Sequence, residues 1–520
     1  MMTLLRPTTM HQLMRWASTI SIRRYAASLL AGACVPLAFS PVGFFPFAVL
    51  SPAVLFYCWL RASPRQALIS GYWFGVGMFG VGVSWVAVSC YRFGGMGLLL
   101  SAATTLLFVL FLALYPALLG WLSRRYFSSL SDRLYLLLLA PALWVFIEWV
   151  RGWLFTGFPW LSLGYSQTDS PLIGIAPLLG TYGVSWAVAL SAGLLVFIFI
   201  EKNQQRIIAL AALVVLWLVA GGLWQIDWSQ AKGSPITASL IQGNVPQNIK
   251  WRPEQRAPTI DLYTRLSRDR WDRDIVIWPE TALPAYYHQA KSFLEKMARD
   301  AYKNGGASLL VGLPILSEQN DSQYYNGVVR VAANAAGEVS TQIYRKSHLV
   351  PFGEYIPFKS VLGRLLDILQ VPMADFSRGA ADQTLLSVGD NKIGMSICYE
   401  DAFGDETIRA LPEASLLVNV SNDAWFGDSF APHQHLQMAR MRTIETSRPM
   451  LRATNNGVSA MIDHRGKILA TSPQFKVAVL DGTIQPQQGA TPYSRVGNWP
   501  VLFALLLVLG MCILRNRAVK

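Results

Sequence analysis

One cysteine occupies a position from which a nucleophile could act. Of the five cysteines in the chain, four lie in or at the ends of long apolar runs: Cys34, Cys58, Cys90 and Cys512. Cys398 instead ends the strand-like run Ile393–Ile397 in a more polar stretch, and Tyr399 and Glu400 follow it. A strand end that leads into a turn presents a side chain and backbone N–H groups to one point, which suits a nucleophile with an oxyanion site. The alternative is a buried cysteine that packs as a small hydrophobe.

A nucleophilic thiol needs a base and a group that stabilises its thiolate. Histidine is the usual base, and the same stretch contains His288, His348, His433, His435 and His464. Two other segments offer a carboxylate and an ammonium instead. Glu280 ends the apolar run that begins at Ile275, and Lys346 precedes an apolar turn that runs to Glu354. Residues such as Glu280 and Lys346, taken singly, are most often ordinary surface charges, so both pairings stay open.

The elements around these residues form an α/β pattern between residues 227 and 497. Segments with helical spacing at Thr259–Arg270 and Ala290–Lys303 separate some of the strand-like runs. Several runs are apolar on both faces, as expected of strands buried in a layered sandwich. The predicted strands are Ile236–Gln242, Asp274–Trp278, Ser308–Gly312, Gly327–Ala332, Lys392–Cys398 and Leu416–Ser421.

The composition places the rest of the chain in a membrane. The 520 residues are 52% hydrophobic and only 14% charged, which excludes an ordinary soluble enzyme and a disordered protein. The net charge of +13 is not a nucleic-acid signal, because residues 225–497 hold 28 basic and 27 acidic residues. The other part of the chain holds 16 basic and 4 acidic residues, as expected where basic residues flank membrane spans.

Charge-free runs predict about eight membrane spans. The run Tyr25–Leu60 is too long for one span, and the turn-like Ser40–Gly43 in its middle predicts a helical hairpin. An N-terminal signal peptide is the rival interpretation, and we reject it because the apolar run continues without a convincing cleavage site. The other predicted spans are Gln66–Tyr91, Phe93–Ser123, Leu134–Arg151, Pro171–Ile200, Ile207–Ile226 and Asn498–Leu514.

The basic residues predict an orientation. With the N-terminus inside, fourteen of the sixteen basic residues outside 225–497 lie in inside loops or tails, which fits the positive-inside rule. The chain then divides into a membrane domain with seven helices at 1–226, an outside domain at 227–497, and a last span with an inside tail at 498–520. Both termini are predicted to be cytoplasmic.

The segments around Glu280, Lys346 and Cys398 resemble the nitrilase superfamily, whose catalytic residues are Glu, Lys and Cys in that order. Longer motifs, and the layout of spans around one large domain, are similar to the apolipoprotein N-acyltransferase family. This resemblance implies a multi-pass α-helical membrane domain plus a periplasmic α/β nitrilase-like αββα sandwich, in the bacterial inner membrane. The motifs are Trp-Pro-Glu at 278–280, Lys-Ser-His-Leu-Val-Pro-Phe-Gly-Glu at 346–354, Ile-Cys-Tyr-Glu at 397–400, Ser-Asn-Asp-Ala-Trp-Phe-Gly at 421–427, Met-Ala-Arg-Met-Arg at 438–442 and Thr-Asn-Asn-Gly at 454–457.

The resemblance also implies a reaction. The acyl donor is a membrane phospholipid, typically phosphatidylethanolamine through its sn-1 chain. The acceptor is the α-amino group of the diacylglyceryl-cysteine at the N-terminus of an apolipoprotein. Cys398 forms a thioester in a ping-pong mechanism, Glu280 is the general base, and Lys346 stabilises the oxyanion. No cofactor, metal or nucleic acid is implied, and a monomer suffices.

Four supporting residues follow from the same resemblance. Glu354 supports Lys346, Tyr399 and Glu400 shape the pocket behind the nucleophile, and Trp251 lies near the lipid chain. Each has a structural alternative: a core aromatic, a capped loop or a satisfied buried carboxylate.

Two membrane features and a loop complete the predictions. Glu148 and Arg151 are three residues apart at the end of the fifth span, and we interpret them as a self-neutralising pair where the helix leaves the bilayer. The aromatics of Gly152–Trp160 suit an interfacial segment that helps bring lipid to the site. Pro357–Gly379 is a candidate lid.

Two rival functions stay open on the sequence. A membrane-bound amidase or nitrilase-like hydrolase would use the same three residues with water as the acceptor. A non-enzymatic transporter or receptor is disfavoured, because the spans lack an obvious row of charges and all three catalytic residues are present.

Overall fold

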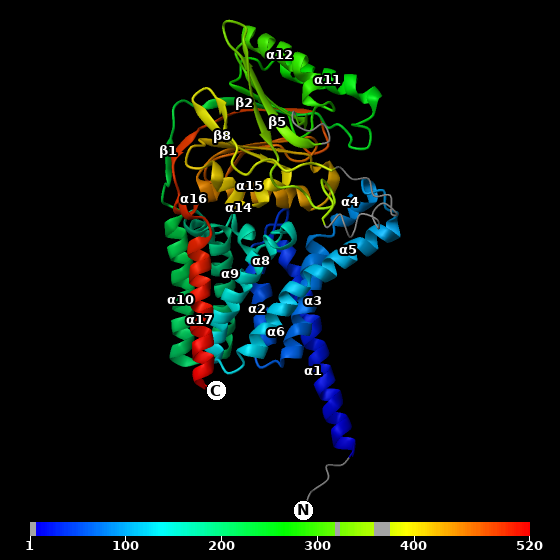
Figure 1. The fold of residues 1–520 in the computed structure, drawn as a ribbon. Helices are drawn as coiled ribbons and strands as arrows, with labels where there is room; N and C mark the ends of the chain where they lie inside the picture. The colour runs from blue at the N-terminus through cyan, green and yellow to red at the C-terminus, as the bar shows by residue number, and fades with distance from the viewer. Residues whose placement is uncertain (1–6, 318–322, 358–374, 520) are drawn as a thin grey trace, which may run out of the picture.

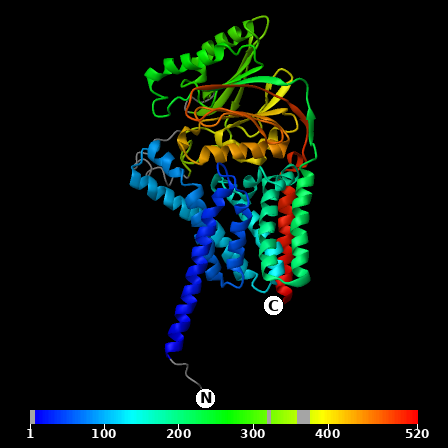
Figure 2. The same ribbon diagram turned by 180° about the vertical axis from the view of Figure 1, so that it is seen from behind.

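The structure is a computed structural model that describes residues 7–317, 323–357 and 375–519. It has a helical part, built from both ends of the chain, and a β-sandwich that lies on one end of the helices (Figure 1). Helix α15 (Ala431–Thr446) lies between the two parts in both views (Figures 1 and 2). The last helix ends on the side of the helical part away from the sandwich.

The helical part contains every segment that was predicted to span a membrane. Helix α9 packs against α2, α8 and α10, and α1 packs against α3. The α4–α5 pair leans away from the other helices toward the sandwich (Figure 1). The bounds are α1 Pro7–Cys34, α2 Phe47–Trp59, α3 Pro64–Gly82, α4 Val86–Arg92, α5 Leu98–Leu112, α6 Leu114–Tyr126, α7 Asp132–Leu134, α8 Ala140–Arg151, α9 Ala176–Ile200, α10 Asn203–Leu223 and α17 Trp499–Val519.

Length and apolarity mark fewer spans than the sequence predicted. Among the described residues, five helical stretches are long and apolar enough to cross a membrane, and there are six if the pair α3 and α4, bent by 53°, forms one span. Helix α2 is apolar but shorter. It packs against α1, and Ser40–Gly43 lies in the connection between them, as the predicted hairpin requires. The count of eight spans stays a prediction.

The sandwich consists of two six-stranded sheets. The first has the order β13-β2-β3-β4-β5-β6 and the second the order β12-β11-β10-β9-β8-β7. Each has three parallel strands at its centre, β2–β4 in one and β8–β10 in the other, with antiparallel strands outside them. The strands are β2 Ile236–Gln242, β3 Ile275–Ile277, β4 Ser308–Leu316, β5 Tyr324–Ala333, β6 Val339–Arg345, β7 Leu386–Val388, β8 Asn391–Ile397, β9 Leu416–Ser421, β10 Met450–Thr454, β11 Ala460–Ile462, β12 Ile468–Thr471 and β13 Ala478–Ile484.

Alternation along the strands produces the layers. On β3, Ile275 and Ile277 face the second sheet and pack with Val418, whereas Val276 faces α11 (Pro253–Arg268) and α12 (Tyr287–Lys303). On the other side, Leu417 packs against Leu436 of α15. The order helix, sheet, sheet, helix is the αββα sandwich that the resemblance implied, and it explains why these strands are apolar on both faces.

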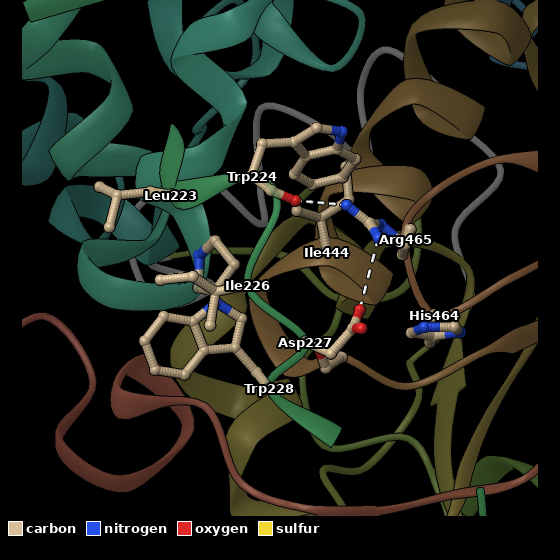
Figure 3. Close-up of a pocket in the computed structure, with 10 residues that line it drawn as sticks. Leu223, Trp224, Ile226, Asp227, Trp228, Ile444, His464 and Arg465 are labelled. Atoms are coloured by element: carbon tan, nitrogen blue, oxygen red, sulfur yellow. Dashed lines mark hydrogen bonds and ion pairs between the residues drawn. The ribbon is translucent and has the colours of Figure 1, made fainter. Parts of the chain in front are cut away.

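The two parts are joined by short paired segments. The chain leaves α10 at Leu223 and returns to α17 at Trp499, so the predicted domain boundaries fall in these connections. Strand β1 (Ser229–Ala231) pairs with β14 (Gln487–Gly489), which ties the entering and leaving segments together. Arg465 of the sandwich stacks on Trp224, donates to its carbonyl oxygen and forms an ion pair with Asp227, with 3.4 Å between Nη1 and Oδ1 (Figure 3). The pocket in Figure 3 therefore belongs to the domain junction, and none of the predicted catalytic residues lines it.

Candidate active site

The three predicted catalytic residues each follow the carboxyl end of a strand. Glu280 lies in the turn after β3, Lys346 directly follows β6, and Cys398 directly follows β8. Because β6 runs in the same direction as β3, Glu280 and Lys346 both lie at the end of the first sheet where these strands have their carboxyl ends. All three are buried, with exposed fractions of 7%, 1% and 8%. The structure thus brings together residues that lie between 52 and 118 positions apart in the chain.

Lys346 lies between two carboxylates. Its Nζ is 2.8 Å from Oε2 of Glu354 and 3.6 Å from Oε1 of Glu280. Asn326 Nδ2 donates to the same pair, at 2.9 Å to Glu354 and 2.6 Å to Glu280. Asn326 was missed by the sequence analysis, because a polar residue near the start of β5 carries no signal of its own. The backbone N–H of Val350 also donates to Glu354, so the predicted support of Lys346 by Glu354 has a direct contact behind it.

The charges of this cluster determine which of its groups carry a proton. Burial raises the pKa of the Cys398 thiol, the Glu280 carboxylate raises it further, and Lys346 opposes both. The thiol is therefore the resting form, and attack requires a base. Burial alone would lower the pKa of Lys346, but Glu354 and Glu280 outweigh burial and raise it. Lys346 accordingly stays a cation beside the nucleophile.

The backbone of Cys398 is held in an uncommon conformation. Its φ of 53° lies in the left-handed region, which non-glycine residues adopt only when the surroundings hold them there. Asn419 Nδ2 donates to the Cys398 carbonyl at 3.3 Å, and His435 Nε2 lies 3.2 Å from the same oxygen. Among the described residues, neither a histidine nor Glu280 forms a hydrogen bond with the Cys398 sulfur, but Glu280 is among the charges that act on the thiol, which supports Glu280 rather than a histidine as the neighbouring base.

Glu400 ties the lysine segment to the nucleophile strand. It is 2% exposed, and burial raises the pKa of its carboxyl. Its oxygens accept from the backbone N–H groups of Ser347 and His348, at 2.6 and 3.0 Å, and of Ile397, at 2.7 Å. The carboxylate therefore fixes the residues beside Lys346 and Cys398 relative to each other.

Tyr399 links the nucleophile to the helical part. Its hydroxyl donates to the carbonyl of Gly157 at 3.0 Å, and its ring stacks on Trp160 with 6.4 Å between centroids. Gly157 has φ 88°, and a Cβ there would collide with the carbonyl of Gly152. Trp251, by contrast, is 51% exposed on the connection after β2. The predicted lid falls largely on residues 358–374, which lie outside the described residues.

Glu148 and Arg151 hold the segment that Tyr399 contacts. Arg151 donates to the carbonyls of Phe158 and Trp160, and Glu148 accepts from the N–H of Leu163 at 2.9 Å. Both side chains are buried. Within the described residues, Glu148 and Arg151 form no ion pair with each other, so the predicted self-neutralising pair is not seen; the two side chains instead hold the chain after α8 back against the helices.

Two family models match the chain. The apolipoprotein N-acyltransferase N-terminal domain matches residues 31–194, and the carbon-nitrogen hydrolase family matches residues 237–493. The solved structure of a carbon-nitrogen hydrolase from Helicobacter pylori G27 covers 48% of this chain and 90% of its own length, at 16% identity and a TM-score of 0.36. The nitrilase-like fold assignment therefore rests on the family model.

Curated relatives match nearly the whole chain. The apolipoprotein N-acyltransferase of Methylococcus capsulatus is 48% identical over 491 residues, which cover 94% of this chain and 96% of the relative. Those of Nitrosomonas europaea and Vibrio parahaemolyticus are 44% and 41% identical, and the matches cover 94% and 95% of this chain and 97% and 98% of the relatives. These relatives match both the N-terminal region and the carbon-nitrogen hydrolase region of the chain, at 41–48% identity over at least 94% of its length. This chain therefore belongs to the apolipoprotein N-acyltransferase family.

Proposed function

We propose that this protein transfers an acyl chain from a membrane phospholipid to the N-terminal α-amino group of diacylglyceryl-cysteine in apolipoproteins. Phosphatidylethanolamine, through its sn-1 chain, is the proposed donor. The observation that carries the proposal is the buried cluster of Glu280, Lys346 and Cys398, set against apolar helices in a chain of this family. Both substrates are lipids or lipid-anchored, so a site tethered beside a bilayer meets them at high effective concentration.

In the first half-reaction, Glu280 takes the Cys398 proton and the sulfur attacks the ester carbonyl of the phospholipid. Lys346 stabilises the oxyanion, aided by a backbone N–H near Tyr399. The ester C–O bond then breaks, Glu280 returns the proton to the leaving oxygen, and a lysophospholipid departs. Cys398 is left as a thioester.

In the second half-reaction, the neutral α-amine attacks the thioester carbonyl. Glu280 takes a proton from the attacking nitrogen and passes it to the departing Cys398 sulfur, which restores the thiol. The amide product needs no ATP, because a thioester is reactive enough toward an amine. Under this proposal the kinetics are ping-pong, and no metal ion or cofactor takes part.

The proposed location is the bacterial inner membrane, with the sandwich in the periplasm and both termini in the cytoplasm. The bias of basic residues supports this orientation. The placement of the sandwich on one end of the helices, opposite the end of α17, is consistent with it (Figure 1). We propose a monomer, since each residue with a proposed role belongs to this chain.

The proposal is tested by the intact mass of the purified protein after incubation with phosphatidylethanolamine. We expect an acyl adduct on the wild type and on Cys90→Ala, a control cysteine of the helical part, and none on Cys398→Ala. A diacylglyceryl-cysteine peptide should discharge the adduct, and water should do so only slowly. Rapid discharge by water would instead identify a hydrolase. A folded protein that gives neither adduct nor lysophospholipid would contradict the mechanism and favour a non-enzymatic role.

A further inference from the structure

A buried lysine beside the proposed base has no part in the reaction described above. Lys250 is 1% exposed and lies on the connection between β2 and α11, next to the half-exposed Trp251. Moving an ammonium out of water is costly unless the protein supplies partners in its place. The partners of Lys250 therefore indicate what it does.

Both hydrogen-bond partners lie in the turn that carries Glu280. Lys250 Nζ donates to the Thr281 hydroxyl at 2.8 Å and to the Glu280 main-chain carbonyl at 3.4 Å. Thr281 has a φ of 45°, a left-handed conformation that is unfavourable for a β-branched residue. The ammonium thus contacts the two residues whose backbone aims the Glu280 carboxylate.

The electrostatics of Lys250 also lead to Glu280. Within the described part of the chain, Lys250 forms no ion pair, and the Glu280 carboxylate is the charge that acts on it. Burial lowers the pKa of Lys250 to about 8, and Glu280 opposes that shift.

We propose that Lys250 is a positioning residue for Glu280: it holds the Glu280–Thr281 turn in place and so keeps the carboxylate where it can receive the Cys398 proton. The inference rests on the proposed role of Glu280 as base. It assigns Lys250 a task distinct from that of Lys346, which contacts the carboxylate itself. Lys250 acts through the main chain and Thr281 and does not touch the reacting atoms.

The test measures the reactivity of the Cys398 thiol without any lipid. The rate of alkylation by iodoacetamide is followed by mass at the Cys398 peptide, and acylation by phosphatidylethanolamine is measured in parallel. Lys250→Met keeps the aliphatic stem, and Lys291→Met, on the exposed face of α12, is the matched control. We expect Lys250→Met to slow alkylation and acylation about 10- to 100-fold with KM for the phospholipid within about twofold, and Lys291→Met to leave both rates unchanged.

A double variant separates positioning from an independent role. Glu280→Gln should slow alkylation strongly, and adding Lys250→Met should slow it no further, because both act through one carboxylate. Independent effects that multiply in the double variant would overturn the proposal. An unchanged alkylation rate in Lys250→Met, or a change confined to KM, would do the same.

Thr281→Val keeps the test open if Lys250→Met does not fold. It removes the hydroxyl that accepts from Lys250 and keeps the β-branched shape, so we expect alkylation about 3- to 10-fold slower. An unchanged alkylation rate in Thr281→Val would overturn the proposal that Lys250 positions Glu280 through Thr281. If the wild type forms no acyl adduct while alkylation still depends on Glu280 and Lys250, the proposed function fails and the positioning role stands.

Discussion

The turn that carries the proposed base, Glu280, and the turn that carries the proposed nucleophile, Cys398, have similar backbone conformations but are held by different contacts. Each contains a left-handed, non-glycine residue, Thr281 in one and Cys398 in the other. In each, a buried cationic residue contacts a main-chain carbonyl: Lys250 contacts that of Glu280 and His435 contacts that of Cys398. The two cations differ in what balances their charge.

His435 belongs to a neutralised network. Its Nε2 is 2.7 Å from Asp401 and its Nδ1 is 3.1 Å from Asp423, and both carboxylates also pair with the fully buried Arg452, at 2.8 and 3.3 Å. Burial and Arg452 lower the pKa of His435, but the two carboxylates outweigh them and raise it to about 9. Two basic residues, His435 and Arg452, thus face two carboxylates, and Arg452 Nη2 also lies 2.8 Å from His435 Nδ1.

The difference indicates how each turn relates to the reaction. The nucleophile turn is held by charges that stay paired throughout the cycle, so its support is mainly a matter of stability. The turn at Glu280 is held by Lys250, and within the described residues Glu280 is the charge that acts on this lysine, so under the proposed mechanism its support changes when Glu280 gains or loses a proton. Variants of the two supports should therefore separate stability from activity.

The largest effect on stability is expected from Arg452→Met. It leaves two buried carboxylates with one histidine, and breaking a buried pair in this way costs about 3–5 kcal/mol of unfolding free energy. Thermal unfolding in a non-ionic detergent measures the loss. Arg440→Met is the control, because Arg440 pairs with the exposed Asp169 and such pairs contribute about 1 kcal/mol or less. Equal losses in the two variants would contradict the role of the network.

Glu280→Gln should show the opposite pattern. Without the proposed base, we expect acylation to fall about 10²- to 10⁴-fold, while the unfolding temperature falls less than in Arg452→Met, because Glu354 still pairs with Lys346 at 2.8 Å. The rate of thioester formation and the unfolding temperature are measured on the same preparation. A large loss of stability with little loss of rate would mean that Glu280 is a structural carboxylate.

The sequence analysis predicted several strands around the site better than the residues that hold the site in place. The strand ends that present Glu280 and Cys398 follow from apolar runs, whereas strand β6, which presents Lys346, was not predicted, and Lys346 was singled out by its motif alone. Asn326 and Lys250 carry no such signal, because their importance comes from a long-range contact with the turn after β3. Strands β10 and β13 were also missed, since the buried Arg452 and the polar Asp481 interrupt their apolar pattern. These residues become intelligible only once the two sheets are packed.

The contributions of His435 and Lys250 to the free energy of unfolding should change with pH in opposite directions. The pKa of His435 is raised from 6.5 to about 9 in the folded protein, so its contribution is complete below pH 6.5 and is lost as pH rises through 9. The pKa of Lys250 is lowered from 10.5 to about 8, so the cost of burying its charge is full below pH 8 and is relieved toward pH 10.5. Each contribution is on the order of 3 kcal/mol.

Unfolding temperatures between pH 6 and 10 test these signs. His435→Gln should remove a fall in stability between pH 6.5 and 9, and Lys250→Met should remove a rise above pH 8. The groups that face His435 are Asp401, Asp423 and Arg452, and Glu280 is the one that acts on Lys250. Variants whose pH profiles change in the same direction would refute the comparison.

The smallest effect is expected at Tyr399, where the nucleophile turn meets the helical part. Tyr399→Phe removes the hydrogen bond to Gly157 and keeps the ring against Trp160, so we expect a loss of about 0.5–1.5 kcal/mol in stability and less than a threefold loss in acylation. Tyr399→Ala also removes the stacked ring and should cost several times more on both measures. If Phe were as damaging as Ala, the hydroxyl rather than the packing would be what the site requires, and Tyr399 would belong with the residues that perform the chemistry.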